Sequence, residues 1–169
     1  MKNLKQEVDA REKTTFSGPE IQSHIPNSKW ILYSKLQGVE NIASFMEGKR
    51  NLLILLDPPN ESIGHFVLLI FKSNNYACFF DPYGNSLKKL LLILGLNTHL
   101  LDLLKGYRVE ENHERYEKSA KKIQTCGRMC LMRGLNSEMT NEEFRNYFHF
   151  RNIHLDELVT LTTQFILKK

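Results

Sequence analysis

The sequence is poor in cysteine and contains no long apolar run. Its 169 residues include three cysteines, Cys78, Cys126 and Cys130, too few for the disulfide framework of a small secreted protein. Its apolar stretches are far shorter than the roughly 20 residues that a membrane-spanning helix requires, and the polar first residues show no secretory signal. We therefore expect a protein of a reducing compartment that has no membrane segment.

The composition does supply enough apolar material for one core. Hydrophobic residues make up 41% of the chain and charged residues 25%, as is usual for a globular protein of one domain. We expect residues 1–15 to form a flexible leader and residues 16–169 to form a single domain that is monomeric. The formal net charge of +4 permits contact with nucleic acid but does not require it.

The apolar pattern predicts an α+β fold, with a small central mixed sheet flanked by helices. Apolar runs bounded by turn residues indicate strands near residues 30–33, 52–56, 65–71 and 76–81, and one edge strand within 107–118. Cap residues and helical spacing indicate helices near residues 17–24, 39–48, 127–134, 140–150 and 155–167. The stretch 87–104 fits either one bent helix or two.

The segment around Cys126 is the first indication of function. Cys126 lies between Thr125 and Gly127 at the start of a predicted helix. At a helix N-terminus the dipole and the backbone N–H groups stabilise a thiolate, and the same groups can bind an oxyanion. Cys130, one turn deeper in the helix, is expected to pack in the core. Taken alone, Cys126 could be a packing residue, a metal ligand or a nucleophile.

Two further residues match the partners that a nucleophilic thiol requires. His65 begins one predicted strand and Asp81 ends the next. If these strands pair as a hairpin around residues 73–75, the two side chains lie together at one edge of the sheet, and the carboxylate can orient the imidazole as a base. Each could instead be structural, His65 as a strand-end residue and Asp81 as a turn residue before Pro82. Their joint placement therefore carries more weight than either residue alone.

Three stretches in order, "GHFVLLI", "CFFDPYG" and "TCGRMC", resemble the His, Asp and Cys blocks of adenain-like cysteine proteases, a superfamily that includes the ubiquitin-like proteases. The resemblance is strongest to capsid-maturation proteases of virophages, Polinton-like elements and large DNA viruses, and it covers roughly residues 16–150. It implies a cysteine endopeptidase that processes capsid or other structural protein precursors, in the virion and the host cytoplasm. It also implies His65 as general base, Asp81 as its orienting residue and Cys126 as nucleophile, with no cofactor required.

The sequence departs from the family pattern at two places. The family commonly has Trp after the catalytic His, where this chain has Phe66. It also has a Gln upstream of the Cys, whose amide donates to the oxyanion, at a position that corresponds to Glu117 here. An ionised carboxylate cannot donate, while Gln124 is an amide that lies closer to Cys126 than the family places it. Gln124 and Glu117 are the candidates for the oxyanion hole, and backbone N–H groups alone are the alternative.

Other functions stay open at the level of sequence. The protein could be an isopeptidase that removes a ubiquitin-like modifier, or a catalytically impaired relative that binds protein or DNA. A zinc site is a further interpretation, but the two cysteines have helical spacing rather than that of a metal knuckle. Its candidate ligands are Cys126, Cys130, His149 and His154.

A group of basic residues surrounds the cysteine segment. This group could form a solvated face, or it could bind DNA. Binding of DNA or of a peptide could stimulate the activity of the protein. The group consists of Lys118, Lys121, Lys122, Arg128 and Arg133.

Overall fold

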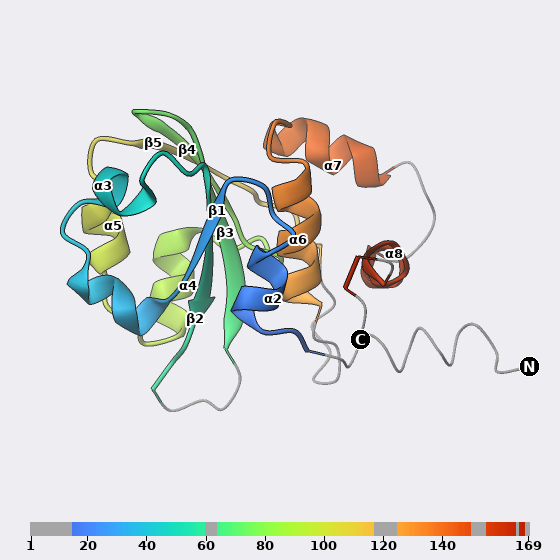
Figure 1. Cartoon of the computed structure of the whole chain (residues 1–169), viewed down its shortest axis with the longest axis horizontal. Coiled ribbons are helices and arrows are strands. Elements are labelled where there is room, and N and C mark those ends of the chain that lie inside the picture. The colour runs from blue at the N-terminus through green and yellow to red at the C-terminus, as the bar shows by residue number, and fades with distance from the viewer. Residues whose placement is uncertain (1–14, 60–63, 117–124, 150–154, 165, 168–169) are drawn as a thin grey trace, which may run out of the picture.

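The computed structural model describes residues 15–59, 64–116, 125–149, 155–164 and 166–167. At its centre is a five-stranded mixed sheet with helices against both faces (Figure 1), so the predicted α+β fold is confirmed. The strands are β1 (Ser28–Leu32), β2 (Asn51–Leu56), β3 (His65–Ser73), β4 (Tyr76–Phe80) and β5 (Arg108–Glu111). The helical elements are α2 (Gly18–Gln22), the 3-10 helix η1 (Tyr33–Gly38), α3 (Ile42–Met46), α4 (Leu87–Ile93), α5 (His99–Leu103), α6 (Cys126–Leu135), α7 (Asn141–His149) and α8 (Leu155–Thr163).

The strands follow one another across the sheet in chain order. Strands β2, β3 and β4 form an antiparallel meander, while the edge strands β1 and β5 pair in parallel with their neighbours. The hairpin between β3 and β4 pairs Leu68 with Phe80. This register brings the start of β3 and the end of β4 together at the same end of the sheet.

The sheet is buried on both faces, because successive side chains of a strand point to opposite sides. On one side, side chains of the central strands pack under α2, α6, α7 and α8 (Figure 1). On the other side, the alternate side chains pack under α3, α4 and α5. Along β3 the first set is Phe66, Leu68 and Ile70, and the second is Val67 and Leu69.

Of the two forms expected for the stretch 87–104, one bent helix or two helices, the structure has the second. The chain turns at Gly95, with a φ of +63°, between α4 and α5. Two other features differ from those expected from the sequence. Helix α6 begins at Cys126 itself rather than at Gly127. The short 3-10 helix η1 has no counterpart in the predicted elements.

Two expectations about the chain as a whole concern its leader and the membrane. The predicted leader, residues 1–15, lies outside the described residues except at its last position. Within the part of the chain that the structure describes, no helix combines the length and the apolar character needed to cross a membrane.

Candidate active site

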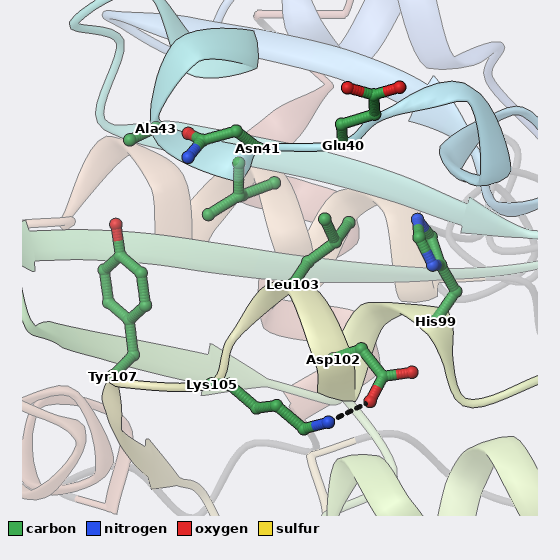
Figure 2. Close-up of a pocket in the computed structure, with 9 residues that line it drawn as sticks. Glu40, Asn41, Ala43, His99, Asp102, Leu103, Lys105 and Tyr107 are labelled. Atoms are coloured by element: carbon green, nitrogen blue, oxygen red, sulfur yellow. Dashed lines mark ion pairs between the residues drawn. The ribbon is translucent and has the colours of Figure 1, made fainter.

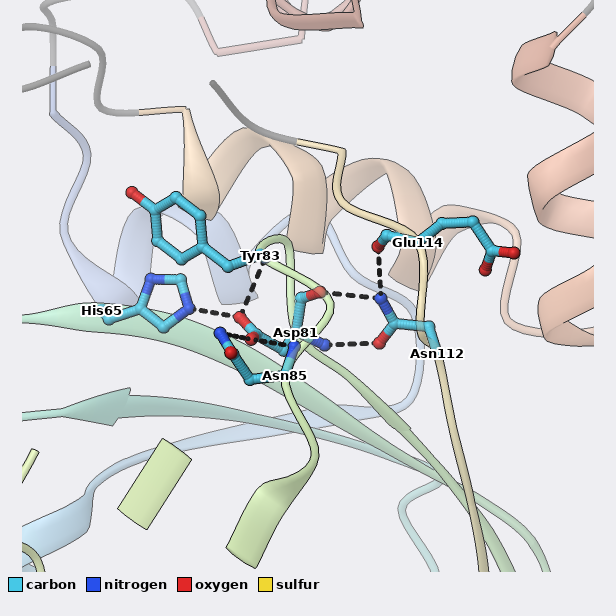
Figure 3. Close-up of polar contacts among 6 residues, drawn as sticks. All are labelled: His65, Asp81, Tyr83, Asn85, Asn112 and Glu114. Atoms are coloured by element: carbon cyan, nitrogen blue, oxygen red, sulfur yellow. Dashed lines mark hydrogen bonds and ion pairs between the residues drawn. The ribbon is translucent and has the colours of Figure 1, made fainter. Parts of the chain in front are cut away.

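His65 and Asp81 lie together at the edge of the sheet where β3 begins and β4 ends. His65 Nε2 is 2.6 Å from Asp81 Oδ1 (Figure 3). The Asp81 side chain is completely buried, and that of His65 is 12% exposed. The contact expected from the hairpin is therefore present, in a place that is largely shielded from water but still reachable from the surface.

The Asp81 carboxylate is held by the turn that follows it. Its Oδ1 also accepts a hydrogen bond from the Tyr83 backbone N–H, at 3.1 Å. Its Oδ2 accepts from both the backbone N–H and the side-chain amide of Asn85, each at 2.9 Å. Burial raises the pKa of Asp81, but the interactions with His65, Asn85 and Tyr83 outweigh it and hold the pKa below its ordinary value. The carboxylate is therefore ionised and fixed in orientation.

Asn112, just beyond β5, holds the backbone of Asp81 in the same way that a paired strand would. The Asp81 N–H donates to Asn112 Oδ1 at 2.8 Å, and Asn112 Nδ2 donates back to the Asp81 carbonyl at 2.8 Å (Figure 3). The same amide donates to the Glu114 carbonyl at 3.1 Å. Asp81 is thus fixed from its own turn and from a segment that follows the edge strand.

The imidazole of His65 interacts with both Asp81 and the Cys126 thiol. Burial by itself lowers the pKa of His65, but the hydrogen bond to Asp81 and the nearby Cys126 thiol outweigh it and raise the pKa. Because Nε2 donates to the carboxylate, the hydrogen-bond pattern assigns Nδ1 as the nitrogen left to accept the thiol proton. This is the arrangement that a thiol and its base require.

Cys126 is the first residue of α6 and is partly exposed. The first turn of α6 is packed tightly against α2 and β3 at Gly127. A Cβ atom at Gly127 would lie 2.5 Å from Ile21 Cδ1 and 3.2 Å from Phe66 Cδ2. The missing side chain therefore lets α6 approach β3 closely enough to place the Cys126 thiol next to His65.

The imidazole of His65 also contacts an aromatic ring, that of Tyr83. The Tyr83 ring lies 4.8 Å from that of His65, with the two planes inclined by 32°. The guanidinium group of Arg115 lies over the Tyr83 ring, at 5.3 Å from its centre. Phe66, the residue where the family has Trp, packs instead in the core beside Gly127. Tyr83 is thus the aromatic residue in contact with the imidazole.

Three residues that hold Asp81 were not predicted from the sequence, and only two of them could have been found from a local sequence pattern. Asn85 and Tyr83 belong to the turn directly after Asp81. An aspartate that begins a turn often accepts hydrogen bonds from the backbone that follows it, so the Asp-Pro pair could have indicated both contacts. Asn112 is 31 residues from Asp81, and no local pattern connects the two. Gln124 and Glu117, the oxyanion candidates, lie outside the described residues, and their roles stay predictions.

The predicted basic surface is wrong for two of its members. Arg128 is 3% exposed and Arg133 is completely buried. Arg128 donates to Thr163 Oγ1 at 2.8 Å and lies over the Phe16 ring. Arg133 donates to the Met139 carbonyl at 3.0 Å. Both guanidinium groups take part in internal packing, while Lys118, Lys121 and Lys122 lie outside the described residues.

The zinc interpretation gains no support from the described cysteines. Cys130 is completely buried in the core on the α6 side of the sheet, as expected for a packing residue. Cys126 faces His65. His154 and the side chain of His149 are outside the described part of the chain.

A pocket of about 340 Å³ lies beside α3 and α5 (Figure 2). It is lined by the segment that leads into α3, by α5 and by Tyr107. Asp102 and Lys105 form an ion pair at its rim, with 2.8 Å between Oδ1 and Nζ. None of the three predicted catalytic residues lines this pocket, so it belongs to a different part of the surface.

Comparison with known proteins gives one relative in sequence and several in structure. No family model matches the chain. A protein of the Sputnik virophage, uncharacterized protein V9, is 29% identical over 173 residues, which span 93% of this chain and 98% of the virophage protein.

The structural similarities extend over nearly the whole chain. The ASFV pS273R protease superposes with a TM-score of 0.50 and 11% identity, covering 95% of this chain and 74% of the protease. The central domain of the uncharacterized Lpg1148 protein from Legionella pneumophila superposes with a TM-score of 0.47 and 13% identity, covering 91% of this chain and 97% of that domain. The virophage relative agrees with the viral resemblance of the sequence blocks. The chain has the fold of the ASFV pS273R protease.

Proposed function

We propose that the protein is a cysteine protease in which Cys126 is the nucleophile, His65 the general base and Asp81 the residue that orients the base. The observation that supports this most directly is the 2.6 Å hydrogen bond between His65 and Asp81, on an imidazole that also interacts with the Cys126 thiol. Residues from β3, the end of β4 and α6 thus converge on one ring.

The chemistry follows from this arrangement. His65 Nδ1 takes the thiol proton, and the Cys126 thiolate attacks the carbonyl carbon of the peptide bond. Negative charge then develops on the carbonyl oxygen, where the N–H groups at the start of α6 can stabilise it. The imidazolium gives its proton to the leaving amine as the C–N bond breaks. Water, activated by His65, then hydrolyses the thioester and regenerates the thiol.

Asp81 acts on this sequence through the imidazole. Its carboxylate fixes the ring plane and the tautomer, and it stabilises the imidazolium that forms when the thiol proton is transferred. The four hydrogen bonds that hold its two oxygens keep it ionised and in place.

We further propose that the substrates are precursors of capsid or other structural proteins. Support comes from the virophage relative and from the resemblance of the His, Asp and Cys blocks to capsid-maturation proteases. An isopeptidase that removes a ubiquitin-like modifier is the second candidate, because the superfamily that the blocks resemble includes such enzymes.

Two experiments test the proposal. A peptide carrying a thiol-reactive group should label the protein at Cys126, as located by mass spectrometry, and should not label Cys126→Ala. Cys78 and Cys130 are buried and serve as internal controls. The purified protein should then cleave a capsid precursor faster than a conjugate of a ubiquitin-like modifier. A protein whose Cys126 is unreactive is not a cysteine protease, and preference for the conjugate would favour the isopeptidase.

A further inference from the structure

A buried polar contact joins the C-terminal helix to the start of the nucleophile's helix. The Thr125 hydroxyl donates to the carboxylate of Asp156, which lies in the first turn of α8. Both residues are completely buried. Thr125 directly precedes Cys126, so this contact is adjacent to the proposed nucleophile.

The direction of the Thr125 side chain is unusual for its position. Thr125 is the N-cap residue of α6. A threonine at this position ordinarily has an extended backbone, from which its hydroxyl accepts a hydrogen bond from the backbone N–H of the second or third helical residue. Thr125 instead has φ −100° and ψ −1°, in the αR region, so it would have to change its backbone conformation as well as its side-chain direction to cap the helix. The Thr125 side chain makes no such capping bond. Instead the hydroxyl donates to the Asp156 carboxyl group, and this hydrogen bond directs the side chain toward α8.

The capping bond would compete with Cys126. The second and third residues of α6 are Gly127 and Arg128, and their N–H groups are the ones that the Thr125 hydroxyl would reach. These N–H groups also contribute to the positive end of the helix dipole, which favours a thiolate at the first helical position. A hydroxyl oxygen placed among them would take up part of that stabilisation.

We propose that Asp156 is a positioning residue that holds the Thr125 hydroxyl away from the N-terminus of α6, so that the N–H groups there serve the Cys126 thiolate and the oxyanion. The proposal rests on the proposed function, since it takes Cys126 to react as a thiolate. It assigns a role at the reaction centre to α8, a helix that contributes none of the three predicted catalytic residues.

A purely structural role for Asp156 predicts different behaviour. In that case the contact would only tie α8 to α6, as the hydrogen bond from Arg128 to Thr163 does near the other end of α8. Loss of Asp156 would then be harmful whether or not residue 125 carries a hydroxyl. If Asp156 restrains the hydroxyl, its loss is harmful only while the hydroxyl is present.

The test is a comparison of Asp156→Leu, Thr125→Val and the double variant in the full chain. Cys126 is alkylated with iodoacetamide at about pH 7, and the labelled site is checked by mass spectrometry. Asp156→Leu should slow alkylation roughly five- to tenfold, because the freed hydroxyl can cap the helix and compete with the thiolate. Thr125→Val and the double variant should react within about twofold of the wild type, because valine carries no hydroxyl that could cap the helix. Asp156→Asn, which keeps an acceptor oxygen, should also react like the wild type.

Thermal unfolding of each variant separates loss of fold from loss of reactivity. If Asp156→Leu does not fold, Asp156→Ala with and without Thr125→Val gives the same comparison. A double variant that is as slow as the Asp156 variant alone would overturn the proposal and leave a structural tie. Alkylation requires no peptide substrate, so the ranking of the alkylation rates among the variants tests the role of Asp156. Whether wild-type Cys126 reacts selectively is a separate result, and it tests the proposed function.

Discussion

At the scale of single residues, the site depends on a carboxylate that is removed from water and yet kept charged. Burying an ionised group is costly unless its oxygens are satisfied. Asp81 meets this condition with donors from His65, Tyr83 and Asn85. The carboxylate is therefore ready to orient the imidazole without first losing a hydration shell.

The two cysteines of α6 should respond to substitution in opposite ways. Cys126→Ala should abolish peptide cleavage and leave the fold intact, because its partly exposed thiol is the proposed nucleophile. Cys130→Ala should keep cleavage but lower the free energy of unfolding by on the order of 1–2 kcal/mol, because it leaves a small cavity in the core. Turnover and thermal unfolding measured on both variants check this. Cleavage by Cys126→Ala, combined with loss in Cys130→Ala, would reverse the two roles.

Replacement of the orienting carboxylate should lower kcat more than it changes KM. In Asp81→Asn the amide can present its N–H groups to the imidazole and favour the wrong tautomer, so kcat should fall by up to roughly 10⁴-fold. The loss should be smaller than that caused by Cys126→Ala, because an orienting residue is partly replaceable. Asp57→Asn is the matched control, since Asp57 also accepts two hydrogen bonds, from Ser34, outside the site. Equal losses in the two variants would remove Asp81 from the proposed triad.

At the scale of elements, close packing of α6 against the segment from α2 to β1 positions the proposed nucleophile, Cys126. Gly127 and Gly134 lie seven residues apart and therefore on one face of α6. A Cβ at Gly134 would lie 2.7 Å from Ile25 Cγ2, and one at Gly127 would lie 2.5 Å from Ile21 Cδ1. The two glycines let the helix axis approach its neighbours more closely than any other residue would allow.

Alanine at either glycine should therefore destabilise the protein. Overpacking costs about 1–3 kcal/mol, which the gain in helix propensity of up to about 1 kcal/mol offsets only in part. Gly127→Ala should also reduce turnover, since the first turn of α6 must shift away from Phe66 and carries Cys126 with it. Gly134→Ala should retain turnover at temperatures where it is folded. Gly38→Ala is the control, because no atom lies within 4 Å of a Cβ built there. Denaturant unfolding measures the free energy of unfolding of each variant. Equal values for all three variants and the wild type would contradict the packing interpretation.

The same elements show what the sequence could and could not predict. The apolar runs of β3 and β4 and the turn between them are local signals, and they placed the His65–Asp81 contact correctly. The contacts of Asn112 with Asp81 and of Asp156 with Thr125 join segments 31 residues apart. Such contacts depend on how whole elements pack. Arg128 and Arg133 were assigned to the surface because charge usually indicates exposure. Their burial depends on partners such as Thr163 and Met139 that no local pattern reveals.

At the scale of the whole molecule, the site lies at one end of the sheet that separates two cores. One core packs under α6 and the other under α3, α4 and α5, with the sheet between them. His65 is partly exposed at the edge of that sheet, whereas Asp81 is fully enclosed. The same pair should therefore influence both catalysis and the pH dependence of stability.

The stability that the His65–Asp81 pair provides should be largest at mildly acidic pH. The pKa of Asp81 is lowered from its ordinary 3.8, although burial opposes this, because His65 and the following turn stabilise the carboxylate. Its contribution is therefore full above about pH 4 and is lost as the pH falls through the lower, folded-state value. The pKa of His65 is raised from 6.5 by Asp81 and Cys126 against the effect of burial. Its contribution is therefore full below about pH 6.5 and is lost as the pH rises through the higher, folded-state value.

Asp81→Asn removes the contribution of the titrating carboxylate and the part of the His65 contribution that comes from Asp81. The free energy of unfolding of the wild type minus that of Asp81→Asn should therefore be greatest between about pH 4 and 6.5. It should decline on either side of this window. Urea titrations of both proteins from about pH 3 to 10 measure this difference directly, and Asp57→Asn again serves as the control. A difference that stays constant with pH would mean that the two groups are not coupled in the folded protein, and His65 would then lack the carboxylate that orients it.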